Sequence, residues 1–327
     1  MQYIGLDLGF GNIKIFSEQG GLVLPSHVAT AGQAVTVAAD DGLHTGKRPD
    51  LVELDGHQFY VGTAAHSWGR PIEALDYGRL HGGPEIRALV YGALSAHECD
   101  GPATLYVGLP LEPLSGDAAN VAATVASIRE WLCGRHAWRI NGRSRQIEIA
   151  AVKISSQPAG AYFDYLLNND GRPHPQRAGL IKEEVGVVSL GFNTLERLVL
   201  REGEIVQRFT AGSTSGVRRL LTLLNTQGDY TLGELDDLLR SGGLHEDRLN
   251  PALDTWGREV VGQLEATWGT NWRRFGRILL VGGGALILNG RLMPVFRGKA
   301  TLASDPVLSI AKGLYKLALF HQQRGQA

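Results

Sequence analysis

The sequence is poor in cysteine, balanced in charge and free of long apolar runs. Its only cysteines, Cys99 and Cys133, form no CxxC pair and no cluster with histidine, so no metal site of that kind is indicated. We expect both to be buried thiols in a reducing cytoplasm. Lysine and arginine total 32 against 33 acidic residues, for a net charge of −1. This balance excludes an overall basic field for direct binding of nucleic acid or an anionic membrane.

No apolar run reaches the roughly 18 residues expected of a membrane-spanning helix. The N-terminus enters a strand pattern directly, without a signal-peptide pattern. We therefore expect a cytoplasmic chain that does not bind a membrane. Glycine, by contrast, is abundant, with 43 residues. The glycines are not periodic and fall at turns between hydrophobic runs, which favours hairpins and close contacts between backbone and ligand.

Hydrophobic patterns predict strands and helices in alternation. Predicted strands cover residues 2–8, 12–17, 21–25, 58–62, 104–110, 186–190, 194–201, 205–210 and 277–281, with a hairpin over 136–153. Predicted helices cover residues 85–97, 160–167, 216–225, 231–240, 250–268 and 306–322, with one more from an N-cap at Ser115 to about Leu132. The polar, poorly periodic pattern of residues 26–56 predicts a loop or an irregular strand. Strands followed by helices occur twice, which indicates an α/β fold.

Two segments of the chain resemble each other. Residues 4–16 read IGLDLGFGNIKIF and residues 186–198 read GVVSLGFNTLERL, so that LGF recurs at a spacing of 182. Asp7 aligns with Ser189. Each copy predicts a strand, a tight glycine turn and a returning strand, with backbone N–H groups facing one concavity. Two such hairpins could clamp nucleotide phosphates from both sides, although a single glycine turn is common in any β-rich protein.

Lys14 distinguishes the first copy. Residues two apart in a strand share a face, so Asn12 and Lys14 project together. The Lys14 ammonium would then lie on a phosphate. The alternative is an ordinary solvated lysine on a strand.

A third glycine turn, 282–284, follows the predicted strand at 277–281. Its spacing does not fit the GxGxxG fingerprint of dinucleotide-binding proteins, and we reject a Rossmann dehydrogenase on that basis.

With these turns in place, the chain resembles the actin-like ATPase superfamily, which also holds Hsp70 and the sugar kinases. Within it, the chain most resembles the bacterial plasmid-segregation actins of the ParM/StbA type. The resemblance rests on five segments in order: IGLDLGFGNIK, YVGLPLE, QPAGAYFDYL, ILLVGGGA and SIAKGLYKLA, at 4–14, 106–112, 157–166, 278–285 and 309–318. It implies two duplicated ribonuclease H-like α/β domains with a nucleotide cleft between them. The first would comprise residues 1–155 with the C-terminal helix 305–327, and the second residues 156–304.

The resemblance also implies roles for residues at matching positions. Asp7 would lie beside Mg²⁺ and the phosphates of ATP or ADP, and Gln157 would orient the attacking water, so these two are the predicted catalytic residues and Asp7 the predicted metal residue. The predicted nucleotide-binding residues are Gly9, Phe10, Gly11, Asn12, Lys14, Gly191, Phe192, Asn193, Thr194, Gly282, Gly283 and Gly284.

Residue chemistry agrees with these roles. A carboxylate beside polyphosphate requires a cation between them, which indicates Mg²⁺ at Asp7. A neutral Gln orients water but is a poor base, which suits slow hydrolysis. The alternative for Gln157 is a structural residue at a helix start before Pro158.

One position departs from the family pattern. The second phosphate loop normally begins with Asp, whereas this chain has Ser189, and Glu196 stands where the family often has Asp. A hydroxyl binds a metal-bound water but carries no charge. We therefore expect weaker Mg²⁺ binding or slower hydrolysis, with less effect on nucleotide binding.

Three functions remain open at this point. The first is an ATPase that polymerises into filaments with ATP, with plasmid or DNA segregation as its role and a DNA-binding adaptor protein as the further partner that the resemblance implies. The second is a nucleotide-binding filament scaffold with little ATPase activity. The third is a small-molecule kinase on the same fold, which is disfavoured because residues 106–115 contain Glu112 but no Asp to serve as the base. Preference for ATP or GTP also stays open.

Overall fold

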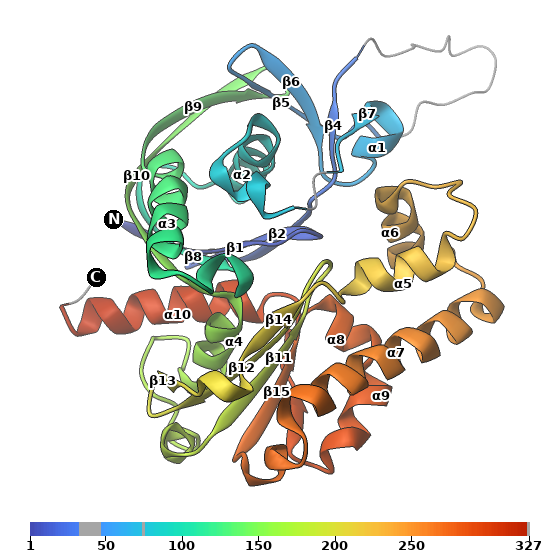
Figure 1. The fold of residues 1–327 in the computed structure, drawn as a ribbon. Coiled ribbons are helices and arrows are strands. Elements are labelled where there is room, and N and C mark those ends of the chain that lie inside the picture. The colour runs from blue at the N-terminus through green and yellow to red at the C-terminus, as the bar shows by residue number, and fades with distance from the viewer. Residues whose placement is uncertain (33–46, 74–75, 326–327) are drawn as a thin grey trace.

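The computed structural model describes residues 1–32, 47–73 and 76–325 of the chain. Its strands form two sheets, one from each half of the sequence, with helices against both (Figure 1). The helices are α1 Ala65–Trp68, α2 Pro84–Ala96, α3 Ala118–Leu132, α4 Gln157–Leu166, α5 Val217–Leu224, α6 Leu232–Ser241, α7 Glu246–Trp268, α8 Gly283–Ile287, α9 Asn289–Leu292 and α10 Ser309–Gln323.

The first sheet has the order β3-β2-β1-β8-β10-β9-β5-β6-β4-β7 within the described ranges. Its strands are β1 Gln2–Leu8, β2 Asn12–Ser17, β3 Gly20–Pro25, β4 Val28–Thr30, β5 Asp50–Leu54, β6 His57–Val61, β7 Arg70–Pro71, β8 Pro102–Leu109, β9 Gly134–Ile140 and β10 Arg143–Ser156. β1 pairs antiparallel with β2 and parallel with β8, and β8 pairs parallel with β10. The parallel centre brings the carboxyl ends of β1, β8 and β10 to one edge, where ligands bind in open α/β sheets.

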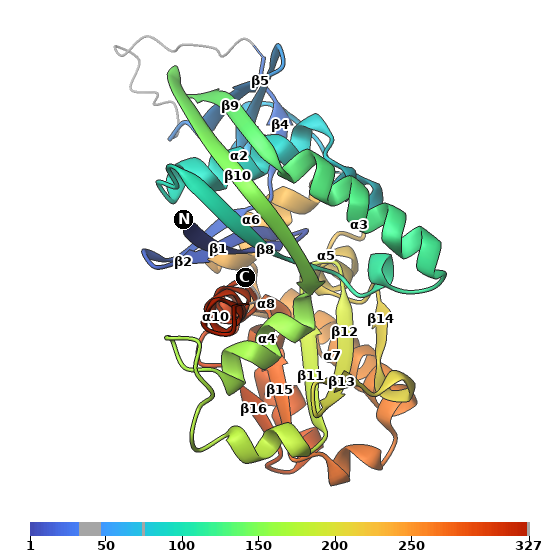
Figure 2. The ribbon, with the colours of Figure 1, turned by 90° about the vertical axis from the view of Figure 1, so that its left-hand side faces the viewer.

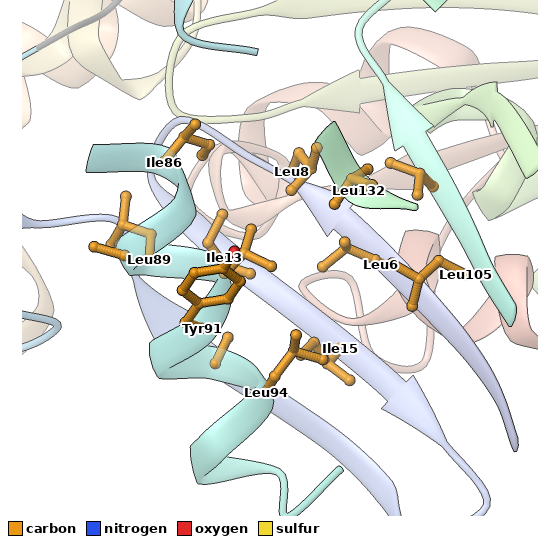
Figure 3. Packing of buried hydrophobic residues seen from close by; sticks show 14 of the residues in the cluster. Leu6, Leu8, Ile13, Ile15, Ile86, Leu89, Tyr91, Leu94, Leu105 and Leu132 are labelled. Carbon is orange, nitrogen blue, oxygen red and sulfur yellow. The ribbon is translucent and has the colours of Figure 1, made fainter. Parts of the chain in front are cut away.

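The core of this half lies between the sheet and helices α2 and α3. Figure 3 shows Ile86, Leu89 and Leu94 of α2 facing Ile13 and Ile15 of β2. Strands β1 and β2 are buried or half-buried at every position because both faces are covered, here by α2 on one side and α10 on the other. A strand buried on both faces is rigid, which suits one that positions functional side chains at its end.

The second sheet has the order β13-β12-β11-β15-β16, with β14 paired to β12. Its strands are β11 Val185–Leu190, β12 Leu195–Arg201, β13 Glu204–Ile205, β14 Ala211–Ser213, β15 Arg277–Val281 and β16 Ala300–Leu302. β11 pairs antiparallel with β12 and parallel with β15. This repeats the arrangement of β2, β1 and β8, so the duplication seen in the sequence is also present in the topology.

Two crossing helices, α4 and α10, lie between the sheets (Figure 2). They approach closely because Gly160 and Gly313 meet at the crossing: a Cβ on Gly313 would strike the carbonyl oxygen of Gly160. α10 also rests on β1, where a Cβ on Gly5 would strike the carbonyl oxygen of Ala311. Small residues at these points allow backbone to contact backbone and form the joint between the two halves.

The element predictions are largely confirmed, with three corrections. The helix predicted from an N-cap at Ser115 begins at Ala118, because Asp117 accepts the N–H groups of the first turn. The predicted strand at 205–210 ends at Ile205 and gives way to a short 3-10 helix, Gln207–Phe209. Cys133 is an exposed free thiol, unlike buried Cys99, because it follows the last turn of α3 at the surface.

Residues 26–56, predicted as loop or irregular strand, contain β4 and β5, and positions 33–46 lie outside the described residues. The predicted domain boundary at residue 155, and the assignment of the C-terminal helix to the first domain, stay predictions.

Candidate functional site

Three glycine turns meet at one cavity of about 270 Å³ between the two sheets. The first joins β1 to β2, the second joins β11 to β12, and the third joins β15 to α8. The cavity is lined by Asp7, Gly9, Phe10, Gly11, Asn12, Lys14, Gln157, Ser189, Gly191, Phe192, Asn193, Thr194, Val217, Asp236, Leu239, Arg240, Gly282, Gly283, Gly284, Leu286, Ile287, Val307 and Ile310. Every residue predicted to bind nucleotide, metal or water is in this set. Their individual roles stay predictions.

The Asp7 carboxylate accepts hydrogen bonds from two polar side chains beside the first hairpin. It lies directly across from Lys14 in the β1–β2 ladder, and the Lys14 ammonium donates to Asp7 Oδ2 at 2.7 Å. The Gln157 amide donates to Asp7 Oδ1, also at 2.7 Å. All three side chains are buried, and together they place an ammonium, a carboxylate and a neutral amide at one wall of the cavity.

Gln157 reaches Asp7 because of where α4 begins. β10 runs parallel to β8 and ends at Ser156, whose side chain caps the first turn of α4. Gln157 is the first residue of that helix, followed by Pro158, so the structural alternative describes its position correctly. Its side chain nevertheless points to Asp7 rather than to its own helix, and its catalytic role stays a prediction.

The second hairpin forms a closed turn that carries a helix. The N–H of Gly191 donates to Thr194 O at 2.9 Å, and the N–H groups of Val217 and Arg218 at the start of α5 donate to the carbonyls of Gly191 and Phe192. The turn also touches its counterpart, because a Cβ on Gly11 would come within 2.5 Å of Phe192 Cβ. Contact between the two turns makes the floor of the cavity.

The ring of Phe10 is buried, whereas Phe192 is half-buried. Phe10 is 7% exposed, packs edge-on against Tyr77 and lies 5.2 Å under the guanidinium of Arg79. Burial lowers the pKa of Arg79 to about 10, which leaves it charged at neutral pH. Phe10 therefore contributes its backbone to the cavity while its ring anchors the turn.

Glu196 repeats the position of Lys14 in the second copy. It lies across from Ser189 in the β11–β12 ladder, as Lys14 lies across from Asp7. Glu196 is 1% exposed; Oε1 accepts the N–H of Leu111 after β8, and Oε2 has no hydrogen-bond partner among the described residues.

This environment changes the charge of Glu196. Burial, together with the negative charge of Asp7, raises its pKa to about 8, although the Leu111 N–H and the charge of Arg197 oppose this shift. The carboxyl on this side is therefore protonated at neutral pH. The second hairpin thus brings no negative charge to the cavity.

The third turn closes the cavity on its far side. Gly282 has φ of 92°, and its Cβ would strike Leu190 O. A Cβ on Gly284 would come within 2.6 Å of Leu190 Cγ, whereas Gly283 has open space before it. Apolar side chains from α5, α6 and α8 continue this wall: Val217, Leu239, Leu286 and Ile287. An apolar wall beside a glycine turn suits a flat ring system.

The sequence did not single out the part of the cavity that comes from α6. Asp236, Leu239 and Arg240 were predicted only as members of a helix at 231–240. Asp236 is 3% exposed and accepts from Arg240 Nε at 2.7 Å. A pair of adjacent acidic residues on the apolar side of an amphipathic helix was the available signal, since buried carboxylates need partners.

The polar groups that line the site are of the kinds that bind a nucleotide together with Mg²⁺. Mg²⁺ keeps several waters and takes one or two carboxylates together with phosphates, and Asp7 is the carboxylate that would serve. Within the described ranges, no group of three or more His, Cys, Asp or Glu side chains forms a protein cage for a metal. Gly283 leaves room for a ligand group close to the backbone, and Lys14 supplies a compensating charge.

The fold around this site is that of the actin-like proteins. Residues 5–160 match the family model described as actin like proteins N terminal domain. No curated protein matches the sequence. The resemblance to actin-like proteins that the motifs indicated is thereby confirmed for the N-terminal half of the chain.

Solved structures extend the likeness over the whole chain. The apo ParM protein of pSK41 matches with a TM-score of 0.72 at 17% identity, covering 100% of this chain and 99% of that one. A ParM from a 15-stranded filament of Clostridium botulinum matches with 0.72 at 19%, covering 98% and 99%. The archaeal actin homologue Ta0583 in complex with ADP matches with 0.72 at 18%, covering 99% and 100%. These identities show the fold. Among the described helices, none is long and apolar enough to cross a bilayer.

Proposed function

We propose that this chain is an actin-like ATPase that binds ATP or ADP with Mg²⁺ in the cavity between its two sheets and polymerises into filaments when ATP is bound. One observation carries the proposal: three glycine turns from distant parts of the chain, together with Asp7, Lys14 and Gln157, line a single cavity. The archaeal relative with the same fold was solved in complex with ADP, which supports the choice of ligand.

The phosphates of the nucleotide are proposed to bind at the wall of the cavity that the first two glycine turns form. The Lys14 ammonium is buried and is held near the turn by Asp7, so it is oriented before a ligand arrives. Both turns line the cavity, and the backbone N–H groups of such glycine turns form phosphate-binding concavities in other proteins. Asp7 would hold waters of Mg²⁺, and the metal supplies charge neutralisation on the phosphates.

Gln157 is proposed to orient the water that attacks the terminal phosphate. Its amide is fixed by Asp7 at 2.7 Å, which leaves its carbonyl oxygen to accept from a water. An amide does not take up the proton of that water. Orientation without a base predicts slow hydrolysis, of the kind used to time a filament.

Ser189 and Glu196 argue further for a slow rate. Where the resemblance leads us to expect an acidic residue, the cavity has the Ser189 hydroxyl, and the neighbouring Glu196 is neutral at pH 7. The cavity then has Asp7 as the carboxylate on the phosphate side. This combination favours nucleotide binding over rapid turnover, and the scaffold with little ATPase activity is its limiting case.

Assembly and biological role follow by analogy. A relative of the same fold was solved as a 15-stranded ParM filament, which supports self-association. We propose a cytoplasmic filament for plasmid or DNA segregation, with a DNA-binding adaptor protein, because the net charge of −1 does not favour direct binding of DNA by the filament itself.

Light scattering at micromolar protein with ATP, ADP or no nucleotide tests assembly, and phosphate release measured in parallel tests hydrolysis. We expect scattering to rise with ATP and release to be slow. Gln157→Ala should lower release at least about tenfold while nucleotide binding persists. No nucleotide-dependent assembly would contradict the filament, and an unchanged release rate in Gln157→Ala would contradict the catalytic assignment.

A further inference from the structure

The start of α6 touches the first half of the molecule, beside the phosphate turns. In Figure 1 α6 lies just below α1 and away from the strands of the second sheet. The contacts place α6 against α1. Three pairs of groups meet there. Their members are His27, His66 and Glu73 on the first side and Thr231, Leu232 and Asp236 on the α6 side.

The deepest of these contacts is a buried hydrogen bond between the halves. His27 Nε2 donates to Asp236 Oδ2 at 3.2 Å, and His27 Nδ1 lies 3.5 Å from Asp237 Oδ1. The side chains of His27 and Asp236 are 7% and 4% exposed. A carboxylate buried this far requires partners, and Asp236 has one from each half, since Arg240 Nε donates to the same oxygen at 2.7 Å.

The outer contact caps α6 from across the cleft. Glu73 Oε1 accepts the N–H of Leu232 at 2.7 Å, at the first residue of the helix. The first N–H groups of a helix lack partners within it, and a negative charge at that end is favourable. α6 also has its own capping box of Thr231 and Glu234, so Glu73 stabilises an end that is already ordered.

The contact between His66 and the start of α6 is closely packed. The ring of His66 faces Gly233, where a Cβ would strike the ring, and lies 5.1 Å from the ring of His27. The space left between the two sides is about 30 Å³, bordered by Phe10, Gly11 and Phe192 of the phosphate turns. The two surfaces therefore meet closely, directly behind the phosphate end of the nucleotide cavity.

We infer that His27, His66 and Glu73 together with Thr231, Leu232, Gly233 and Asp236 form a clasp that holds the cleft shut and sets the rate at which nucleotide leaves. The link to the cavity is Asp236. Its carboxylate and Arg240 line the nucleotide cavity, while the same carboxylate is held by His27 from the opposite half. His27 is thus a positioning residue, which fixes the α6 wall without touching the ligand. This inference rests on the proposed nucleotide site.

Opening the cleft requires these bonds to break, so weakening the clasp should speed release. We expect a fluorescent ADP analogue, chased with unlabelled ADP in a stopped-flow instrument, to dissociate at least about tenfold faster from His27→Ala and from Gly233→Val. Tenfold corresponds to about 1.4 kcal/mol. His57→Ala and Gly262→Val are the matched controls, because His57 is exposed on β6 and Gly262 has open space around it on α7. Both should release at the wild-type rate.

Hydrogen exchange at the Leu232 amide gives a second readout that needs no nucleotide. In the wild-type chain its proton is held by Glu73 and should exchange slowly, and Glu73→Ala and His27→Ala should accelerate it. Glu73 is exposed, so its variant keeps the test valid if His27→Ala does not fold. Unchanged exchange in both variants would show that no clasp closes the cleft.

Faster exchange with unchanged release of the ADP analogue would also overturn the inference, because the clasp would then not control the ligand. If the folded wild-type chain binds no nucleotide, the proposed function fails. The exchange measurement alone then decides whether the clasp holds the halves together.

Discussion

The two duplicated hairpins differ most at one pair of facing residues. The first has Asp7 opposite Lys14, a charged pair at 2.7 Å. The second has Ser189 opposite Glu196, where the carboxyl lies on the other strand and is protonated at neutral pH because it is buried. A hydroxyl and a neutral acid provide hydrogen-bonding groups without charge. The two hairpins are therefore asymmetric, and the negative charge that they bring to the cavity comes from Asp7 of the first.

The raised pKa of Glu196 predicts a pH dependence of stability. The folded chain holds a proton from about pH 4.5 to about pH 8 that the unfolded chain releases. The contribution of Glu196 to the free energy of unfolding should therefore fall across this window as pH rises, by up to about 1.4 kcal/mol per pH unit, and be constant on either side of it. Glu196→Gln keeps an acceptor for the Leu111 N–H and lacks the titration. Urea unfolding of both proteins at pH 5, 6, 7 and 8 should show their difference changing with pH, and a constant difference would contradict the buried neutral acid.

Most residues of the cavity could be named from sequence because glycine turns and their polar neighbours are local patterns. Lys14 and the first two glycine turns follow from strand periodicity and the repeat, whereas the roles of Asp7, Gln157 and the third turn follow from the resemblance to actin-like proteins. Asp236 and Arg240 could not be named in this way, because their place depends on α6 reaching across the cleft, which is a long-range contact. The sequence also left the charge of Glu196 undetermined, since that depends on burial beneath Leu111.

At the scale of elements, the hairpins and buried helices were predictable and the short connections were not. β1 to β3 and the β9–β10 hairpin have strong period-two or continuous apolar patterns, and their predicted bounds agree closely with the structure. The strand predicted at 205–210, after β12, is wrong because a 3-10 turn interrupts the alternating pattern there. This turn buries Phe209 against Trp268 and Phe275. Tertiary packing overrides local pattern there.

The crossing of α4 and α10 allows a test of how the halves are joined. Glycine to alanine in an open helix position stabilises by about 0.5–1 kcal/mol, and Gly262→Ala on α7 should do so because no atom lies within 4 Å of its Cβ. Gly313→Ala should instead lower the free energy of unfolding by about 1–3 kcal/mol, since its Cβ would strike Gly160 O and lie 2.6 Å from Asp164 N. Urea unfolding of the two variants measures whether each substitution raises or lowers the free energy of unfolding. Stabilisation by Gly313→Ala would show that the helices do not cross closely.

At the scale of the whole molecule, the nucleotide cavity and the clasp belong to one cleft. α4 and α10 join the halves, the two phosphate turns touch at Gly11 and Phe192, and α6 reaches back to α1. A ligand held by turns from both halves stabilises their closed arrangement. The proposed nucleotide-dependent filament would need this coupling of ligand to shape.

The most direct measurement of the central claim is calorimetric titration of Mg-ATP into the wild-type chain and two valine variants. Gly283 borders the cavity with open space before it, so Gly283→Val should fold normally and occupy the space of the ligand. Gly290→Val is the control, because Gly290 is exposed on α9 with no atom near its Cβ. We predict one saturable site in the wild type and in Gly290→Val, with affinity at least about tenfold lower in Gly283→Val. Absence of binding to the folded wild type, or equal affinity in all three proteins, would contradict a nucleotide site between the glycine turns.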